Sequence, residues 1–318
     1  MIVLTADNAN ILFTSACRAL TDFGEPVSPR GMATTEILGA HLRLTQPRRR
    51  FVDVPPLRLL NPAFAVAEAV WILSGSDDDW IFQYNRALTR YADDGVLQGA
   101  YGPRMRRWND AIDQLDRVRQ LLQRDPDTRQ AVIQLYDPQR DTRGHRDVPC
   151  TLGYRFYLRR GRLHMHTTMR SQDIWLGFPY DIFTNTLIQE LLAGWVGAEL
   201  GEYHHHIDSL HLYAENVSAA EQLAHDPEPS PVMPEVALPW NVADQVLRNT
   251  VTEPPTHDLT GIWSGFAQML ASYRAWGTGD RDHARTLLAD TDGDLVRALE
   301  RWYDHLAPAP AKQGAPAS

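Results

Sequence analysis

The chain has 318 residues, 43% of them hydrophobic, and a formal net charge of -9 at pH 7. This content suffices for one large domain or two small ones, and the negative charge disfavours a protein that wraps a nucleic-acid backbone. No apolar run reaches the length of a membrane span, the first residues lack the pattern of a signal peptide, and the two cysteines form no disulfide framework. We therefore expect a cytoplasmic protein that binds neither membrane nor nucleic acid.

A strand and a helix are predicted in the first quarter of the chain. Residues 36–46 partly alternate apolar and polar side chains, as strands do. Residues 61–75 have a helical pattern, with Asn61 as a cap, Pro62 in the first turn and Gly75 as a stop.

Further elements follow in the middle of the chain. A second, amphipathic helix is predicted within residues 111–129, ending at the turn of residues 125–127. Residues 130–137 and 152–170 are typical of strands, and the second stretch should form a hairpin around "RRGR". Residues 182–200 predict a long apolar helix in the core.

The last part of the chain divides into connections, helices and a tail. Residues 226–257 are rich in proline and polar residues and look like surface connections, whereas residues 264–306 predict two or three helices. Residues 307–318 have the composition of a disordered segment. We expect a main domain over 1–258 and a helical extension over 259–306. The main domain should be α+β, with one large mixed sheet backed by helices.

Cys150 follows a proline at the start of a predicted strand. A lone cysteine is most often a small buried hydrophobe. A nucleophilic cysteine instead needs its thiolate stabilised by nearby cations. The sequence offers four arginines for this role and leaves open whether they converge: Arg30, Arg104, Arg129 and Arg170.

Two carboxyl groups stand in apolar surroundings. Glu68, in "AVAEAV", is either an exposed position on an amphipathic helix or a proton-transfer group. Asp181, in "FPYDIF", should have a partner, because an unpaired buried carboxylate is costly. The alternative is that Asp181 only caps the helix that follows it.

Histidines occupy positions 204–206 and 211. Neighbouring residues of a strand point to opposite faces, so three consecutive histidines cannot all face one ion without strain. The chain also has no HExxH motif, no P-loop and no dinucleotide-binding glycine pattern. We expect surface or hydrogen-bonding roles for these histidines, and no metal.

A series of short motifs resembles those of the thymidylate synthase family. In chain order they are PRGMAT, AEAVWILSG, AYGPRMRRW, DPDTRQ, PC, RSQD, LGFPYD and HLY, spanning about residues 28–220. Each motif alone is weak, whereas their common order and spacing are specific. The resemblance implies the thymidylate synthase fold, a catalytic main domain, a homodimer and 5,10-methylenetetrahydrofolate as co-substrate.

The resemblance implies roles in the reaction for four residues. Cys150 would attack C6 of a pyrimidine nucleotide, so that C5 becomes nucleophilic and captures the one-carbon unit of the folate. Glu68 would organise water and move protons, and Tyr101 would assist removal of the proton at C5. Asp173 would contact the pterin.

The resemblance also implies a nucleotide site. The residues implied for the 5′-phosphate are Arg30, Arg170 and Ser171, together with Arg129 from the other subunit of the dimer. Those implied for the sugar are His211 and Tyr213.

The most informative departure from the synthases is Asp181, which stands where they have asparagine. The asparagine amide complements uracil, accepting from N3–H and donating to O4, whereas cytosine presents the opposite pattern. A carboxyl group suits cytosine, either as an acid that donates to N3 or as a carboxylate paired with N3-protonated cytosine. A carboxylate opposite O4 of uracil would cost about 1–3 kcal/mol. Because aspartate here resembles the deoxycytidylate and cytidylate hydroxymethylase branch, we expect Asp181 to read cytosine.

Other departures concern water and the sugar. Leu88 stands where the family has a tryptophan that packs the cofactor, Thr151 replaces a histidine, and no apolar closing segment is recognisable. A wetter pocket favours addition of water and hence a hydroxymethyl product. Gln130 replaces an interface arginine and Ser209 an aspartate, which leaves the choice between ribose and deoxyribose open, with a slight preference for dCMP.

The sequence therefore predicts a homodimeric hydroxymethyltransferase that acts on dCMP or CMP without a metal. The first alternative is a thymidylate synthase that methylates dUMP. The second is a catalytically silent nucleotide- or RNA-binding relative that uses its C-terminal helices to bind a partner.

Overall fold

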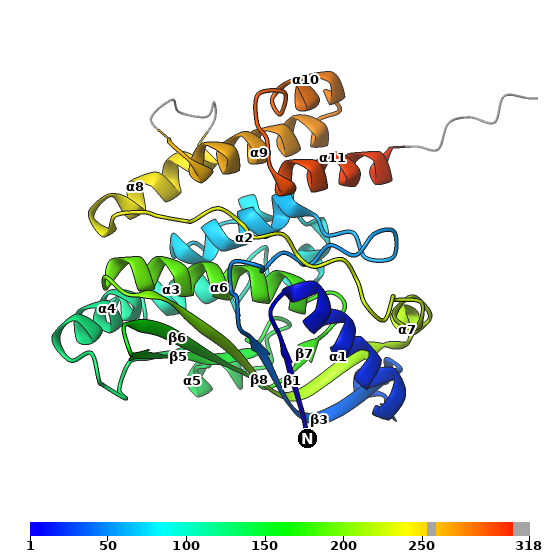
Figure 1. Cartoon of the computed structure of the whole chain (residues 1–318), viewed down its shortest axis with the longest axis horizontal. Helices are drawn as coiled ribbons and strands as arrows, with labels where there is room; N and C mark the ends of the chain where they lie inside the picture. The colour runs from blue at the N-terminus through cyan, green and yellow to red at the C-terminus, as the bar shows by residue number, and fades with distance from the viewer. Residues whose placement is uncertain (253–258, 308–318) are drawn as a thin grey trace, which may run out of the picture.

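The computed structural model describes residues 1–252 and 259–307. One mixed sheet of eight strands forms the base of the molecule in Figure 1. The strand order is β1-β3-β8-β6-β5-β4, with β2 paired to β3 and β7 paired to β8. The strands are β1 (Ile2–Ala6), β2 (Glu25–Val27), β3 (Thr34–Leu44), β4 (Val132–Gln134), β5 (Thr151–Arg159), β6 (Arg162–Met169), β7 (Gln172–Asp173) and β8 (Glu199–Tyr213).

The long helices of the main domain lie on one side of this sheet (Figure 1). The α-helices are α1 (Ala9–Phe23), α2 (Pro62–Leu73), α3 (Tyr101–Arg106), α4 (Gln114–Arg124), α5 (Pro138–Asp141), α6 (Phe178–Trp195), α7 (Ala214–Glu221), α8 (Trp240–Val251), α9 (Ile262–Gly277), α10 (Arg281–Thr286) and α11 (Asp294–Leu306). Three short 3-10 helices are η1 (Pro29–Gly31), η2 (Asp79–Gln83) and η3 (Arg86–Tyr91). The mixed sheet with its helical layer confirms the α+β class.

The predicted helix with Asn61 at its start is confirmed as α2. The Asn61 side chain accepts a hydrogen bond from the backbone N–H of Phe64 at 3.2 Å, as an N-cap does. Gly75, just beyond the helix, has a φ of +73°, a left-handed conformation that favours glycine. The predicted hairpin is also confirmed, since β5 and β6 pair antiparallel around Arg160 and Gly161.

One predicted helix is confirmed with different bounds, and one predicted connection was wrong. The helix predicted over 182–200 begins earlier and ends at Trp195, and the apolar residues after it leave the helix at Gly197, with a φ of +71°, and enter β8. Residues 240–251, predicted as part of a connection, form α8, whose buried side chains pack towards the core. The segments on both sides of this helix are rich in proline and polar residues, and they obscured its helical pattern in the sequence.

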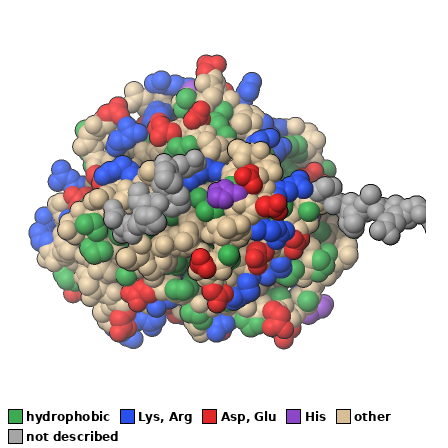
Figure 2. All heavy atoms as spheres, turned by 90° about the horizontal axis from the view of Figure 1, so that it is seen from above, with side chains coloured by type: hydrophobic (Ala, Val, Ile, Leu, Met, Phe, Trp, Pro, Cys, Tyr) green, Lys and Arg blue, Asp and Glu red, His purple; other side chains and the backbone are tan. Residues whose placement is uncertain are grey.

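The C-terminal helices form a further layer above α2 (Figure 1). Their buried side chains, such as Phe266 and Leu299, belong to the same hydrophobic cluster as those of α2. Acidic and basic side chains alternate over this face, as Figure 2 shows. The division at residues 258 and 259 stays a proposal, and residues 308–318 of the predicted tail lie outside the described part of the chain. Within residues 1–252 and 259–307, no helix combines the length and apolar character of a membrane span.

Candidate active site

Glu68 is the one residue of α2 whose side chain is not buried. The rest of the helix is buried, so this carboxyl is the single partly exposed position on an otherwise buried helix. Desolvation by the surrounding protein, followed by the negative charge of Asp181, raises the pKa of Glu68 to about 8. The carboxyl is therefore protonated at neutral pH, a state in which it can donate a proton.

Asp181 lies in the first turn of α6 but does not cap the helix. The N-cap residue is Gly177, and no side chain caps this helix end. The carboxyl of Asp181 instead accepts a hydrogen bond from the Gln172 side-chain amide, with Oδ2 2.8 Å from Nε2. Desolvation raises the pKa of Asp181 to about 6, while the Gln172 hydrogen bond lowers it. Asp181 thus has the protein partner that its apolar setting predicted, and the capping alternative is wrong.

Cys150 lies directly before β5 and is half-buried. The Arg170 guanidinium is 3.7 Å from its Sγ, and the same guanidinium donates to the carbonyls of Val148 and Pro149 at 3.0 Å. Arg170 therefore fixes the loop that carries the cysteine. Burial raises the pKa of the thiol, and the charges of Arg170 and Arg30 oppose this effect without overcoming it.

Tyr101 connects the first turn of α3 to the cysteine loop. Its hydroxyl accepts a hydrogen bond from the backbone N–H of Thr151, the residue after Cys150, at 3.2 Å. Desolvation, and then the charges of Cys150 and Asp181, raise the pKa of Tyr101 well above its usual value. Tyr101 is therefore a neutral hydroxyl beside the cysteine.

The charges of Arg30 and Arg170 both act on Cys150, and Arg30 also interacts with Tyr213, one of the residues predicted for the sugar. Arg30 adopts a left-handed conformation with φ of +53°, which is uncommon for a residue with a side chain and typical of functional loops. Ser171 Oγ is 3.5 Å from His211 Nδ1, and the His211 and Tyr213 rings are 5.3 Å apart. The arginine charge next to two hydroxyls and an imidazole is suited to a phosphorylated sugar.

Two of the four candidate arginines do not join this group. Arg104, in α3, forms a buried ion pair with Asp141, in α5, with Nη2 2.6 Å from Oδ1. This pair connects the two helices. Arg129 follows Thr128, whose carbonyl accepts from Arg159 at the far end of β5. Because β5 begins beside Cys150, Arg129 and Cys150 lie at opposite ends of that strand within one protomer.

The folate-side residues show one preformed acceptor. Asp173 Oδ1 accepts from the backbone N–H groups of Trp175 at 2.8 Å and Leu176 at 3.0 Å. Within the described residues no donor contacts Oδ2, so this oxygen can accept a hydrogen bond from a ligand. Leu176 is 48% exposed and supplies apolar surface beside it. Leu88, in η3, is partly buried against the core.

Sequence reasoning missed a buried hydrogen-bonded chain behind Asp181. His205 Nε2 is 2.9 Å from Gln172 Oε1, and His205 Nδ1 is 2.5 Å from the Tyr203 hydroxyl. The His205 ring packs edge-on against Phe178 of α6, so it faces the helical layer. Alternation along β8 was the available signal, since it places Tyr203 and His205 on the same face.

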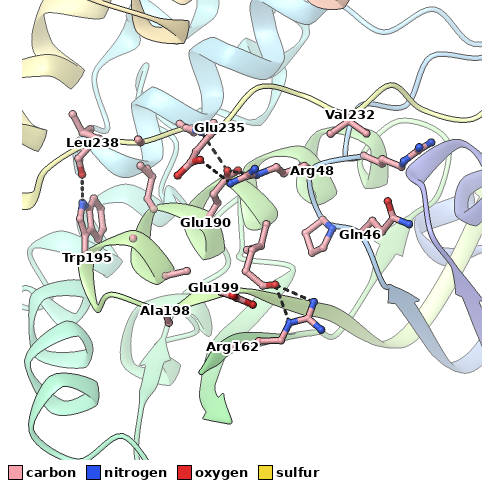
Figure 3. A pocket seen from close by; sticks show the side chains of 18 of the residues that line it. Gln46, Arg48, Arg162, Glu190, Trp195, Ala198, Glu199, Val232, Glu235 and Leu238 are labelled. Atoms are coloured by element: carbon pink, nitrogen blue, oxygen red, sulfur yellow. Dashed lines mark hydrogen bonds and ion pairs between the residues drawn. The ribbon is translucent and has the colours of Figure 1, made fainter. Parts of the chain in front are cut away.

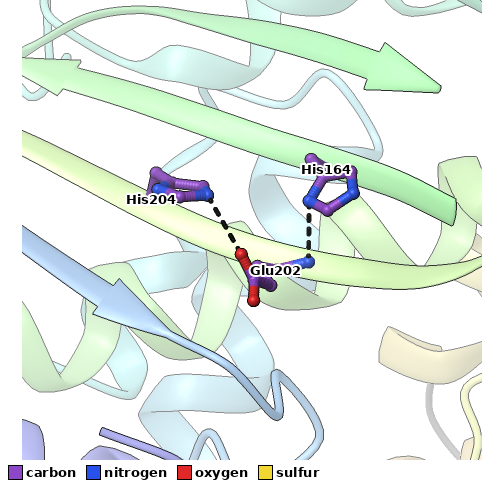
Figure 4. A group of neighbouring side chains, drawn as sticks. All are labelled: His164, Glu202 and His204. Carbon is purple, nitrogen blue, oxygen red and sulfur yellow. Dashed lines mark hydrogen bonds and ion pairs between the residues drawn. The ribbon is translucent and has the colours of Figure 1, made fainter. Parts of the chain in front are cut away.

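The neighbouring histidines lie on the opposite face of the sheet, as alternation predicted. There, His164, Glu202 and His204 lie together (Figure 4), and their ligand atoms are within 4.8 Å of one another. The guanidinium of Arg43 bonds both carboxylate oxygens of Glu202, at 2.6 and 3.0 Å. Both oxygens of the Glu202 carboxylate are therefore already paired with a cation, Arg43, and a metal ion would have to compete with it.

A cavity of about 890 Å³ lies away from Cys150, between the end of α6 and residues 232–240. Arg48 forms ion pairs with Glu190 and Glu235 at its edge, and the Trp195 indole donates to the Leu238 carbonyl (Figure 3). None of the candidate catalytic residues lines this cavity. Arg162, also at its edge, donates to the Leu200 carbonyl, and the cavity is not the site built around Cys150.

Comparison with known proteins agrees with this geometry. The chain is 37% identical, over 210 residues, to a protein named deoxyuridylate hydroxymethyltransferase from Bacillus phage SP01. The matched part is 62% of this chain and 55% of that protein, so the chain spans little more than half the length of this relative. The relative's name specifies deoxyuridylate, where the sequence predicted a cytidylate. The family description "Thymidylate synthase" matches residues 12–249, which include every candidate catalytic residue, and the chain therefore belongs to the thymidylate synthase family.

Proposed function

We propose that this protein transfers a one-carbon unit from 5,10-methylenetetrahydrofolate to C5 of a pyrimidine nucleoside 5′-monophosphate. Water completes the reaction, so that the products are the 5-hydroxymethyl nucleotide and tetrahydrofolate. Support comes from the grouping of Cys150, Glu68, Tyr101 and Asp181, and from the similarity to a protein named as a hydroxymethyltransferase. Thr151 and Leu88, in place of larger side chains of the synthases, support water as the final reactant.

Each residue of the site has a separate role in the attack on C6 and the removal of the proton at C5. Cys150 Sγ forms a bond to C6 of the pyrimidine and gives up its proton, and Arg170 stabilises the thiolate as it forms. Glu68 holds a proton at neutral pH, which it can share with the base while negative charge develops on the ring. Tyr101, beside Cys150, assists removal of the proton at C5. The folate, when bound, supplies a carbon at the oxidation level of formaldehyde.

The proposed preference for a cytosine base rests on Asp181. With either pyrimidine, an ionised carboxylate opposes one acceptor of the base, so the pair needs one extra proton between them. In cytosine that proton can sit on the basic ring nitrogen N3, where it also draws electrons from the ring. In uracil it must stay on the acid, because O4 is a much weaker base. The proton thus has two possible places with cytosine and one with uracil, so a carboxyl group at position 181 favours cytosine.

The sugar and base assignments lead to dCMP or CMP as the proposed substrate. Ser171, His211 and Tyr213 lie together at the sugar side, a pattern that favours dCMP. A second candidate is dUMP, because the named relative acts on deoxyuridylate by its name. A protonated Asp181 presents one acceptor and one donor, as the asparagine amide does, and its raised pKa makes that state accessible.

We also propose that the active unit is a homodimer. Arg129 lies at the opposite end of β5 from Cys150, so a protomer cannot bring it to its own phosphate site. The long helices cover only one side of the sheet, which leaves the other side available to a second copy (Figure 1). A sheet-to-sheet contact would let Arg129 of one protomer reach the nucleotide of the other.

The experiment is a substrate competition followed by mass spectrometry. The protein and 5,10-methylenetetrahydrofolate are incubated with equimolar dCMP, CMP and dUMP, with Cys150→Ala as the control. A cytosine nucleotide that gains the mass of formaldehyde, with tetrahydrofolate as coproduct, supports the proposal and identifies the sugar. Hydroxymethylated dUMP would replace the cytosine assignment, and methylated dUMP with dihydrofolate would identify a synthase. Nucleotide binding without any product would favour the silent relative.

A further inference from the structure

A continuous chain of hydrogen bonds runs inward from Asp181 to the core of the sheet. Gln172 Nε2 donates to Asp181 Oδ2 at 2.8 Å, and His205 Nε2 lies 2.9 Å from Gln172 Oε1. The Tyr203 hydroxyl lies 2.5 Å from His205 Nδ1 and accepts from the Asn185 amide at 2.9 Å. The side chains of Gln172, His205 and Tyr203 are buried, and each of them is hydrogen-bonded within the chain.

The direction of every bond in this chain follows from one backbone carbonyl. Gln172 Nε2 also donates to the carbonyl of Asp173 at 3.2 Å, and a carbonyl can only accept. The Gln172 oxygen must then face His205, which must carry its proton on Nε2. The remaining ring nitrogen, Nδ1, must accept the single proton of the Tyr203 hydroxyl, so Thr167 Oγ1, 3.1 Å from that hydroxyl, must donate to it.

Burial keeps this arrangement constant over the working pH range. Desolvation lowers the pKa of His205 to about 3, so the ring stays neutral and a single tautomer persists. A change of tautomer would leave acceptors facing each other at Gln172. In a buried chain each such mismatch is costly, because water cannot replace the lost partner.

We propose that Gln172, His205 and Tyr203 act as positioning residues that fix which oxygen of Asp181 receives a hydrogen bond and which is left to carry a proton. Asp181 Oδ2 is held as an acceptor, so a proton on the acid belongs on Oδ1. The acid then presents its donor and acceptor to the base in one fixed order. A fixed order matches one pyrimidine and opposes the other, so these three residues determine base selectivity. The inference rests on the proposed function in one respect, that Asp181 faces the base.

Local packing is consistent with this role. Gly177 lies beside the contact: a Cβ built on it would lie 3.0 Å from Gln172 Nε2 and 3.5 Å from Asp181 Oδ2. A side chain at position 177 would push the amide away from the acid. The glycine therefore leaves the space in which Gln172 and Asp181 meet.

The test is Tyr203→Phe, which removes one hydroxyl two side chains away from Asp181. Without that hydroxyl, His205 Nδ1 loses its hydrogen-bond donor and the ring is held from the Gln172 side alone, so the ring and the Gln172 amide that it contacts can shift. We expect the ratio of kcat/KM for dCMP to that for dUMP to move towards one by roughly tenfold. The matched control is Tyr303→Phe in α11, which also removes a buried hydroxyl, one that lies 2.8 Å from Ser272 Oγ.

A second variant keeps the test open if Tyr203→Phe does not fold. Gln172→Met has a similar length but cannot donate to Asp181, and the same shift in the ratio is expected. An unchanged ratio in a folded variant, including an equal loss of activity on both bases, would overturn the inference, because a merely structural role lowers both rates alike. Binding of dCMP and dUMP to the wild-type protein, measured first by calorimetry without folate, separates this outcome from a failure of the proposed function.

Discussion

The negative charge of Asp181, on α6, helps to raise the pKa of Glu68, on α2, to about 8. Desolvation is the larger cause, and the two helices pack against each other, which brings the carboxyl groups into one electrostatic environment. The pKa of Asp181 is lower, about 6, because Gln172 donates to it. One carboxyl is therefore a proton donor near neutral pH while the other is mostly ionised, a separation typical of acid–base sites.

The first prediction concerns the pH dependence of the reaction. The Glu68 carboxyl holds its proton below about pH 8, so kcat/KM should fall as the pH rises through that value. In Glu68→Gln this descending limb should disappear, and kcat should drop by roughly 10²–10⁴-fold. Steady-state rates across pH measure both effects, with Glu221→Gln in α7 as an exposed-carboxylate control. A limb that persists in Glu68→Gln would assign it to another group.

The second prediction follows from the same pKa but concerns stability. The folded-state pKa of Glu68 lies above the unfolded value, so ionisation favours the unfolded chain, and stability falls as the pH rises from about 4.5 to about 8. Glu68→Gln should therefore raise the free energy of unfolding by about 1–3 kcal/mol near pH 9 and by little near pH 5. Urea titrations at both pH values test this. The same difference in free energy of unfolding between Glu68→Gln and wild type at both pH values would contradict the prediction.

The sequence predicted candidate reacting groups but not the residues that orient them. The motif around Asp181 located the carboxyl, and alternation along 204–206 correctly separated His205 from its two neighbours. It did not reveal which face His205 joins, because Gln172, His205 and Asp181 come from β7, β8 and α6 and meet only in the folded chain.

Contacts between distant segments also determine the place of Arg104 and the end of α6, which the sequence pattern did not predict. Arg104 was a candidate for the cysteine site, but its pairing with Asp141 depends on how α3 and α5 pack, which no local pattern encodes. The helix predicted over 182–200 continued too far because residues after Trp195 are as apolar as the helix itself. Their place in β8 is set by pairing with β6, a contact between segments far apart in sequence.

The third prediction tests whether Asp181 recognises the base. Asp181→Asn replaces the carboxyl by an amide of the same shape, which accepts from N3–H and donates to O4 of uracil. The ratio of kcat/KM for dUMP to that for dCMP should rise by about 10–100-fold, which corresponds to about 1–3 kcal/mol per mismatched pair. Parallel assays with both nucleotides measure it. A ratio that does not change would show that Asp181 does not face the base.

The fourth prediction uses two glycines of the α6 region. Gly177→Ala would place a Cβ 3.0 Å from Gln172 Nε2, so the amide must shift and the Asp181 contact should weaken, with a loss of base selectivity. Gly194, in the same helix, has no neighbour within 4 Å of an added Cβ. Gly194→Ala should therefore leave selectivity unchanged and stabilise the helix by about 0.5–1 kcal/mol. Equal selectivity in the two variants would show that position 177 does not control the amide.

The fifth prediction tests whether Arg129 acts across a dimer interface. Arg129→Ala should raise KM for the nucleotide, and Cys150→Ala should abolish turnover, because each removes one part of the same site from a different protomer. Co-expression of the two variants with different tags allows the mixed dimer to be isolated. One of its two sites then combines an intact Cys150 with an intact Arg129, so the mixed dimer should show about half of the wild-type activity. Mixed dimers with no more activity than Arg129→Ala alone would place Arg129 outside the nucleotide site, whereas a monomeric protein in sedimentation would reject the shared site altogether.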